Sequence, residues 1–296
     1  MDSTPLVTIA IPTYNRADGY LRGCIASALD QGYPNLEVVV SDNCSVDDTS
    51  GLVASFADER LRYIKHPENI GATNNFNFCL QEARGTYFLL LHDDDLIDKD
   101  FVESCISATD GKEYGLIRTG TRIMDGDGKV KRRPLNFCTG DDLESLCESW
   151  FADKTAIYQC STLYNTAALR AVGEFHSRTG VFLDALAILL IAAKYPVLNI
   201  EAAKAAFREH AGEMTFAATV ADWCVDSHQL IDVVDDCCRY DKEKLHQAAC
   251  DFFARLNYRR ADAVKTRGKR LWAYFIVMKA FNFKYMPPPL RRILRR

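Results

Sequence analysis

The stretch that decides the fold is TYFLLLHDDD at residues 86–95, an apolar run that ends in three consecutive aspartates. Such a run is typical of a short strand buried on both faces of a parallel sheet. Two earlier stretches, LVTIAIPTYNR at 6–16 and LEVVVSDN at 36–43, have the same form. Ligands of open α/β sheets bind in the crevice outside the carboxyl ends of the strands. We therefore expect the polar residues at 13–16, 42–43 and 92–95 to face one site.

Helical periodicity separates these predicted strands. Apolar residues recur on one helical face over 20–29, over the segment after Asp48, and around 76–83, and a further short strand is expected at 61–64. Asp47, Asp48 and Thr49 lie where they would cap the second helix. Repeated strand–helix–strand units predict an α/β fold with a mostly parallel sheet flanked by helices.

The remainder of the chain has a different pattern. A strand is expected at 116–124, short helices follow it, and the clearest helix lies at 183–195. From about residue 216 the signal is helical only. We therefore predict a catalytic domain at 1–215, divided into halves at 1–110 and 111–215, and a helical extension at 216–296.

The composition of the chain limits the binding partners and the cellular compartment that we expect. The net charge of −4 gives no argument for a nucleic acid partner. The 11 cysteines lack the spacing of zinc ligands or of a disulfide framework, which favours reduced thiols. The N-terminus has no signal-peptide pattern, and no stretch of about 20 apolar residues suggests a spanning helix. These features lead us to expect a cytoplasmic protein.

The three aspartates at 93–95 indicate a cation site. Carboxylates this close together repel one another unless a positive charge neutralises them. Mg²⁺ and Mn²⁺ take oxygen ligands and are commonly held by one or two carboxylates together with substrate phosphates. No glycine-rich phosphate loop follows the first strand, so a diphosphate bound here would need such a metal. The alternative is a solvated acidic turn before a helix near Asp98.

Four motifs in register resemble the family-2 glycosyltransferases. They are IPTYNR at 11–16, VVSDNCSVDDT at 39–49, PENIGATNNFN at 67–77 and LLLHDDDLI at 89–97, with weaker similarity at FLDALAILLIA (182–192) and FREHAGEMT (207–215). The resemblance implies a GT-A fold and an inverting transfer, dependent on Mg²⁺ or Mn²⁺, from a nucleoside-diphosphate sugar to an acceptor hydroxyl. We further expect a role in the assembly of a polysaccharide or glycolipid, an expectation that rests on the basic C-terminal segment described below.

The same resemblance assigns roles to individual residues. Asp184 would be the base that takes the proton of the acceptor hydroxyl, and Asp94 would bind the metal, with His92, Asp95 and His210 as further candidate ligands. The donor would contact Pro12, Thr13, Tyr14, Arg16, Asp42, Asn69, Gly71, Asp93 and Arg208. Structural alternatives exist for several of these residues: Asp42 and Asp184 could cap helices, and Asn69 with Gly71 could form an ordinary turn.

One position departs from the family pattern and keeps other functions open. His92 stands where the family usually has the first aspartate of its acidic motif, so a catalytically inactive nucleotide-binding or scaffold protein is one alternative. A sugar-nucleotide nucleotidyltransferase is another, although IPTYNR is not the glycine-rich basic loop expected for a triphosphate.

The C-terminal segment from Tyr258 to Arg296 is basic and interleaved with aromatic residues. Basic residues beside an apolar face favour an anionic membrane surface. The alternative is a solvated helix that packs on the catalytic domain. Membrane contact at the inner face would suit a lipid-linked saccharide acceptor, whereas a free saccharide would not require it.

Overall fold

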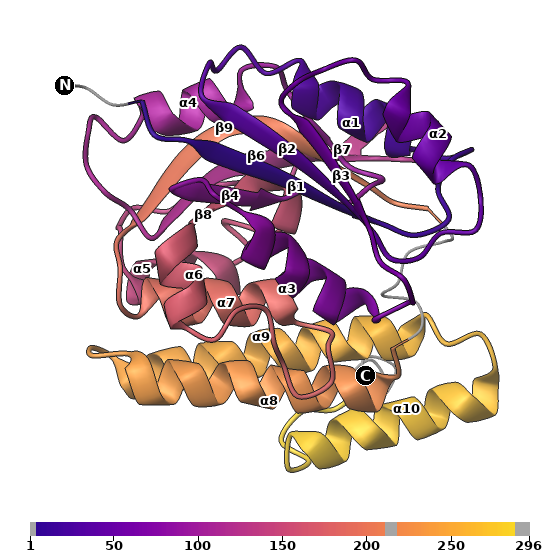
Figure 1. Cartoon of the computed structure of the whole chain (residues 1–296). Coiled ribbons are helices and arrows are strands. Elements are labelled where there is room, and N and C mark those ends of the chain that lie inside the picture. The colour runs from indigo at the N-terminus through magenta and orange to yellow at the C-terminus, as the bar shows by residue number, and fades with distance from the viewer. Residues whose placement is uncertain (1–3, 211–217, 288–296) are drawn as a thin grey trace.

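The computed structural model describes residues 4–210 and 218–287 (Figure 1). Its strands form one nine-stranded sheet in the order β3-β2-β1-β4-β8-β6-β9-β5, with β7 beside β6. The strands are β1 (Val7–Thr13), β2 (Leu36–Asp42), β3 (Leu61–Lys65), β4 (Tyr87–Leu90), β5 (Leu96–Ile97), β6 (Leu116–Met124), β7 (Val130–Arg132), β8 (Thr162–Asn165) and β9 (Val197–Arg208).

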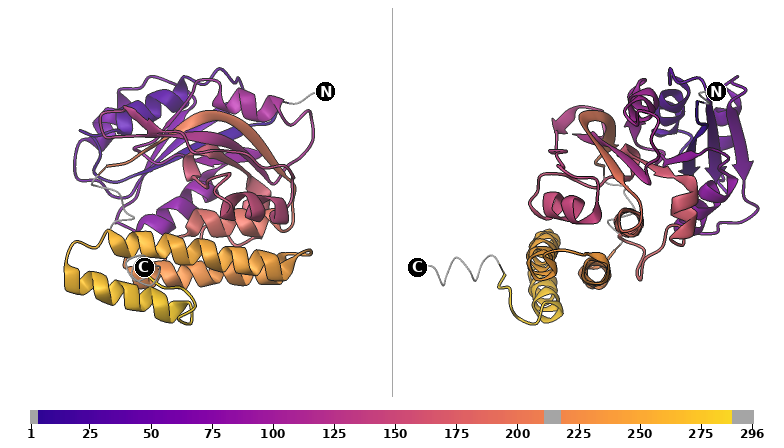
Figure 2. Two further views of the ribbon diagram at one scale, coloured as in Figure 1. Left: turned by 180° about the vertical axis from the view of Figure 1, so that it is seen from behind. Right: turned by 90° about the vertical axis from the view of Figure 1, so that its left-hand side faces the viewer.

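Helices cover the sheet in layers, as Figures 1 and 2 show. One face carries α1 (Leu21–Leu29), α2 (Thr49–Ala54) and α4 (Phe101–Ser107). The other face carries α3 (Ala72–Glu82), α5 (Leu143–Phe151), α6 (Thr166–Ala171) and α7 (Leu183–Ala192), with the 3₁₀ turn η1 (Gln159–Ser161) before β8. A further layer beneath them consists of α8 (Val220–Cys237), α9 (Lys242–Asp262) and α10 (Arg267–Ala280).

The strands β1 to β4 confirm the parallel half of the sheet that the sequence predicts. β1 pairs in parallel with β2 and with β4, and β2 pairs in parallel with β3. Successive residues of β1 point to opposite faces, so Ile9 joins the core under α1 while Ala10 joins the core on the α3 side. The predicted cap is also present, because the Asp48 side chain accepts a hydrogen bond from the Gly51 N–H. The register places Thr13 beside Asp42, and the loops after these strands leave the same edge.

The second half of the sheet mixes parallel and antiparallel pairs. β6, where the sequence predicts a strand, pairs antiparallel with β7 and β8 and parallel with β9. The sequence pattern does not predict the strand β9, whose 12 residues include several alanines and a lysine. Its pairing with β6 along most of its length supplies the strand geometry that residue propensity does not.

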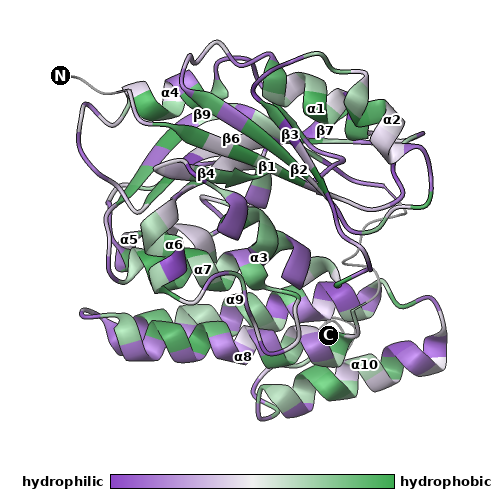
Figure 3. Ribbon diagram, in the orientation of Figure 1, coloured by the Kyte–Doolittle hydropathy of each residue, from purple (hydrophilic) through white to green (hydrophobic). Residues whose placement is uncertain are grey.

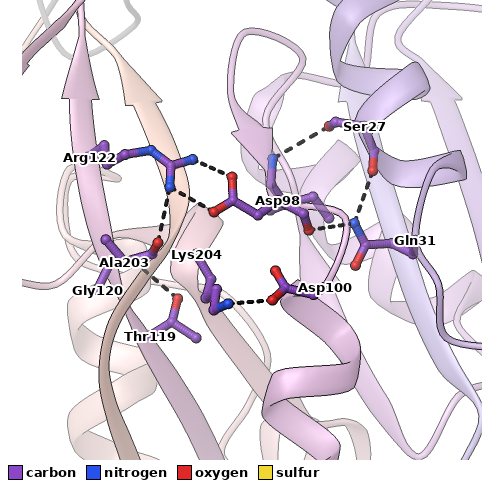
Figure 4. A network of polar contacts seen from close by, with 10 residues as sticks. Ser27, Gln31, Asp98, Asp100, Thr119, Gly120, Arg122, Ala203 and Lys204 are labelled. Carbon is purple, nitrogen blue, oxygen red and sulfur yellow. Dashed lines mark hydrogen bonds and ion pairs between the residues drawn. The ribbon is translucent and has the colours of Figure 1, made fainter.

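A polar network joins the two halves of the sheet beside the predicted site (Figure 4). Asp98, which follows β5, accepts hydrogen bonds from the Arg122 guanidinium of β6. Its main-chain carbonyl accepts one from Gln31 Nε2 at 2.9 Å. Lys204 of β9 pairs with Asp100 two residues further on. The network therefore fixes the chain directly after the acidic cluster against β6 and β9.

The C-terminal helices share a hydrophobic core with the layer above them. Trp223 of α8 and Phe253 of α9 belong to the same buried cluster as Phe88 of β4 and Phe182 before α7. Figure 3 shows that apolar residues are concentrated in the sheet, whereas α8–α10 carry both apolar and polar residues. Helix α8 begins with a capping box between Thr219 and Asp222. The predicted domain boundary near residue 215 lies outside the described residues.

Among residues 4–210 and 218–287, no helix has both the length and the apolar character needed to cross a bilayer.

Candidate active site

The strand ends open into one cavity of about 470 Å³. One wall comes from the loops after β1, β2 and β4, and the opposite wall comes from α5, η1, α7, α8, α9 and the segments beside them. The lining residues that the sequence predicts are Pro12, Thr13, Tyr14, Arg16, His92, Asp93, Asp94, Asp95 and Asp184. The structure therefore brings nine of the predicted site residues to a single cavity.

Asp93 is held between two residues of the first loop. Thr13 Oγ1 donates a hydrogen bond of 2.7 Å to Asp93 Oδ2, and Arg16 Nε lies 3.8 Å from Asp93 Oδ1. Burial and the neighbouring Asp94 charge together raise the pKa of Asp93 to about 7, against the lowering effects of Thr13 and Arg16. The site therefore holds more negative charge than its own residues neutralise.

The end of β9 fixes the position of the other two aspartates. The main-chain N–H of Arg208 donates to Asp95 Oδ1 at 2.9 Å, and Arg208 Nε donates to the Asp94 carbonyl at 2.8 Å. The same guanidinium lies 4.3 Å from the centre of the Tyr20 ring. His210 Nε2 lies 2.9 Å from Asp94 Oδ2. Arg208 is buried and does not line the cavity, so its observed contacts support the acidic loop, and donor binding by this residue stays a prediction.

The donor set fits a divalent cation. Ligand atoms of His92, Asp94 and Asp95 lie within 4.8 Å of one another. In the described part of the chain, His92 Nε2 and Asp95 Oδ2 are buried and have no hydrogen-bond partner. Burial, followed by the Asp94 charge, raises the pKa of Asp95 well above its ordinary value. A cation bound here would relieve the charge repulsion and give the unpartnered atoms a ligand. His210 contacts this cluster through Asp94 but is not part of it.

Asp184 lies on the opposite wall, as the second residue of α7. Burial raises the pKa of this carboxyl, while the Ala185 N–H and the nearby His92 lower it. The Ala185 N–H donates to Asp184 Oδ1 at 2.8 Å, which orients the side chain. A carboxylate with a raised pKa is a stronger proton acceptor than an ordinary aspartate.

Besides Arg208, three predicted donor-binding residues do not line this cavity. Asp42 is fully buried and accepts hydrogen bonds from the Ser45 N–H and the Tyr63 hydroxyl. Asn69 and Gly71 lie in an exposed turn, in which Gly71 has a φ of 81°. The contacts of these residues build the loops around Asn43, which does line the cavity, and their donor-binding roles stay predictions.

The sequence reading does not find the residues of the second wall. They are mainly aromatic and include Trp150, Tyr158, Gln159, Phe182, Trp223 and Arg260. None of these residues follows a predicted strand or lies in one of the four motifs. Most are of the residue types found in an ordinary hydrophobic core. Only the proximity of Phe182 to Asp184 in the sequence could have indicated one of them.

The fold and the acidic cluster at the strand ends define an α/β protein of the GT-A class. The model of glycosyl transferase family 2 matches residues 8–172, more than half of the chain, and the chain belongs to this family. The fold class that the sequence motifs imply is thereby confirmed.

Relatives in several bacteria share the N-terminal part. A putative teichuronic acid biosynthesis glycosyltransferase, TuaG of Bacillus subtilis, is 33% identical over 126 residues, 42% of this chain and 50% of that protein. Chondroitin synthase of Escherichia coli is 38% identical over 137 residues, 45% of this chain and 20% of that protein. The chain therefore spans half of one relative and a fifth of the other.

Solved structures extend the likeness in fold over nearly the whole chain. TarS 1–349 of S. aureus, solved with UDP-GlcNAc, has a TM-score of 0.71 at 18% identity and covers 93% of this chain and 81% of that one. The mannosyltransferase PcManGT of Pyrobaculum calidifontis, solved with GDP-Man and Mn²⁺, has a TM-score of 0.58 at 17% identity, with 96% and 87% covered. At this identity the likeness shows the fold alone.

Proposed function

We propose that this protein is an inverting, metal-dependent glycosyltransferase that moves a sugar from a nucleoside-diphosphate sugar to a hydroxyl of a saccharide or lipid-linked saccharide. The observation that carries the proposal is the single cavity that joins the cluster at 92–95 to Asp184. Polysaccharide assembly is the proposed setting, because relatives such as the succinoglycan biosynthesis protein ExoO of Rhizobium meliloti act in it by name.

The acidic wall would hold the donor. Asp94, Asp95 and His92 would bind Mg²⁺ or Mn²⁺, and the carboxylate-rich donor set with one imidazole suits Mn²⁺ well. When bound, such an ion supplies Lewis-acid stabilisation of the departing diphosphate. Thr13, Tyr14 and Arg16 surround Asp93 and would contact the nucleoside.

The opposite wall would activate the acceptor. The acceptor oxygen forms the new bond to the anomeric carbon while the bond from that carbon to the diphosphate oxygen breaks, and the hydroxyl proton passes to Asp184. Attack from the face opposite the leaving group inverts the configuration. The apolar lining around Asp184 keeps water from competing as acceptor.

A thermal-shift series tests the donor half of the proposal. UDP, GDP, CDP and dTDP are each added to the full chain with and without Mn²⁺. One diphosphate should stabilise the protein only with metal, by about 2.7 kcal/mol at a hundredfold excess over its Kd. Asp94→Ala should remove this shift, while Asp110→Ala, at an exposed position, should keep it. No shift with any diphosphate would contradict metal-assisted donor binding and favour the scaffold alternative.

We also propose that the protein contacts an anionic membrane surface through α10 and the turn after it. Leu271, Trp272, Phe275, Phe283 and Met286 form an exposed apolar group, here called the aromatic patch; Trp272 is 63% exposed. The Trp272 and Phe275 rings stack at 5.3 Å. Residues 263–287 contain six lysines and arginines and no aspartate or glutamate. Apolar rings beside unopposed positive charge are complementary to acidic lipid headgroups.

A further inference from the structure

The second wall of the cavity carries a cation that donor binding does not explain. The Arg260 guanidinium of α9 lies 3.4 Å from the centre of the Trp223 ring and 5.4 Å from that of Phe182. Its Nη1 atom is buried without a hydrogen-bond partner in the described part of the chain, and no ion pair involving Arg260 is found there. Burial lowers the pKa of Arg260 to about 10, so the side chain is still charged at neutral pH.

A second donor on this wall also lacks a partner. Gln159 is only 7% exposed, and its Oε1 atom accepts a hydrogen bond from the Tyr164 hydroxyl at 3.0 Å. Its Nε2 atom is buried and unpartnered among the described residues, although Gln159 lines the same cavity as Arg260. Buried donors without acceptors cost free energy, and the cost is larger for charged groups. Both groups would be satisfied by an acceptor atom supplied by a ligand.

Arg260 is held in place by the helices beneath it. One turn earlier, the fully buried Asn257 donates to Ser227 Oγ at 2.9 Å, and that hydroxyl donates to the Trp223 carbonyl at 2.6 Å. These bonds fix α9 against α8, and Trp223 in turn supports the guanidinium. A cation fixed in this way binds with a smaller loss of side-chain entropy than one on a free surface.

The position of Arg260 points to the acceptor and not to the donor. Its pKa responds to burial and to the Cys224 thiol, and no aspartate of the 93–95 cluster contributes. The ring contacts of the guanidinium are with Trp223 and Phe182, and Phe182 lies two residues before Asp184 in the chain. Arg260 and Asp184 line the same cavity, which places the guanidinium on the side of the proposed base.

We propose that Arg260 recognises an oxyanion, a carboxylate or a phosphate, carried by the acceptor saccharide. The guanidinium presents N–H groups that match either oxyanion, and Gln159 offers a further N–H on the same wall. The rest of the acceptor then lies along aromatic side chains such as Trp150 and Tyr158. This inference rests on the proposed function and narrows its acceptor to an acidic sugar class.

Binding of three matched probes to the full chain tests the inference. The probes are p-nitrophenyl β-glucoside, the corresponding glucuronide and the corresponding glucoside 6-phosphate, measured by calorimetry with Mn²⁺ and the stabilising diphosphate present. At least one anionic probe should bind about tenfold more tightly than the neutral glucoside, because a charge-assisted hydrogen bond contributes about that factor. The anionic probe with the larger preference identifies carboxylate or phosphate as the source.

Variants of α9 separate the possible outcomes. Arg260→Gln should bind all three probes equally, whereas Arg255→Gln, which removes an exposed ion pair with Asp153, should keep the preference. Diphosphate binding with Mn²⁺ should be unchanged in both, so failure of the donor proposal is seen separately. Equal binding of the probes by wild type, a preference retained in Arg260→Gln, or diphosphate binding lost in that variant would each overturn the inference.

A second measurement covers the case in which Arg260→Gln does not fold. Added salt should weaken binding of the anionic probe to wild type and leave the glucoside unaffected, because only the former forms an ion pair. Arg260→Met keeps the apolar stem against Trp223 and should abolish that salt dependence. Salt effects that are the same for the neutral and anionic probes would overturn the inference without any variant.

Discussion

The two walls of the cavity are built by different means. The first wall, from Pro12 to Asp95, is mainly polar, and its polar residues, apart from Asn75 of α3, lie within a few positions of the end of a parallel strand. The second wall, from Trp150 to Arg260, collects residues from several helices and from irregular segments between them. Parallel strands place their ends at a common edge through backbone pairing alone. The second wall depends on side-chain packing and on a few buried hydrogen bonds.

The electrostatic states of the two walls also differ. The first wall concentrates carboxylates whose mutual repulsion and burial raise the pKa of Asp93 to about 7. The second wall contains the half-buried Arg260 cation and aromatic rings, and a single carboxylate, Asp184, at the junction. We infer a division of labour, in which the first wall binds donor and metal, and the second binds and activates the acceptor. The predictions below test this division.

The largest effect is expected at the junction between the walls. Asp184→Asn keeps the size of the side chain but removes the proton acceptor, so kcat should fall by about 10²–10⁴-fold. Metal-dependent diphosphate binding, which belongs to the first wall, should stay within twofold of wild type. Turnover measured with separate thermal shifts checks both parts, and Glu201→Gln, at an exposed position on β9, is the control. Loss of diphosphate binding in Asp184→Asn would refute the division.

The pH dependence of turnover sharpens the role of Asp184. Burial raises the pKa of its carboxyl in the folded protein, so the base should become protonated at a higher pH than an ordinary aspartate near 3.8. Below that raised pKa, kcat at saturating metal should fall about tenfold per pH unit. Parallel titration of diphosphate binding distinguishes this effect from protonation of the acidic cluster.

Stability gives an independent check with a defined sign. A carboxyl whose pKa is raised on folding stabilises the fold at low pH, and this contribution is lost as pH rises through the folded pKa. The free energy of unfolding of wild type should therefore decrease relative to Asp184→Asn as pH rises above 3.8. Parallel unfolding curves for the two proteins across this range would contradict the raised pKa.

The difference between the walls explains what the sequence predicts well. Apolar runs such as that before His92 identify strands by local pattern, and the polar residues that follow then share an edge by topology. Eight of the nine predicted residues in the cavity meet there for this reason, and the ninth, Asp184, comes from α7. The pattern does not reveal which polar residues turn inward: Asp42 is the last residue of β2, yet it is fully buried and binds Ser45 and Tyr63.

The second wall could not be predicted for a physical reason. The strand β9 is rich in alanine, and its pairing with β6, more than 70 residues earlier in the chain, determines its conformation. Arg260 has no local signal, since a basic residue near the end of a helix is ordinary at a surface. Its burial follows from the packing of α9 on α8 and on the core around Phe182. Such long-range contacts leave no periodic trace in the sequence.

A fourth prediction concerns how α8 supports the acceptor wall. The fully buried Asp226 accepts hydrogen bonds from the main-chain N–H groups of Thr179, Val181 and Phe182, which lead directly to Asp184. Asp226→Asn turns an amide N–H group toward these donors and should cost about 1–3 kcal/mol of stability. A small displacement of Asp184 should lower kcat about tenfold.

The control for this prediction lies on the same helix. Asp232→Asn removes an exposed ion pair with Arg178 and should change both stability and kcat very little. Diphosphate binding should be normal in Asp226→Asn, because the hydrogen bonds of Asp226 go to residues 179–182 and not to the acidic cluster. A variant with wild-type kcat but reduced stability would show that the loop before α7 tolerates displacement, and α8 would then serve the fold alone.

The smallest effect on chemistry is expected furthest from both walls, at the aromatic patch. Trp272→Ala combined with Phe275→Ala should reduce flotation of the full chain with vesicles of phosphatidylglycerol and phosphatidylcholine several-fold, because less apolar surface enters the lipid interface. Transfer to a water-soluble acceptor should not change, since neither residue lines the cavity. Phe137→Ala, at an exposed position in another segment, is the control. Absence of flotation by the intact chain would refute membrane contact and leave the division between the two walls intact.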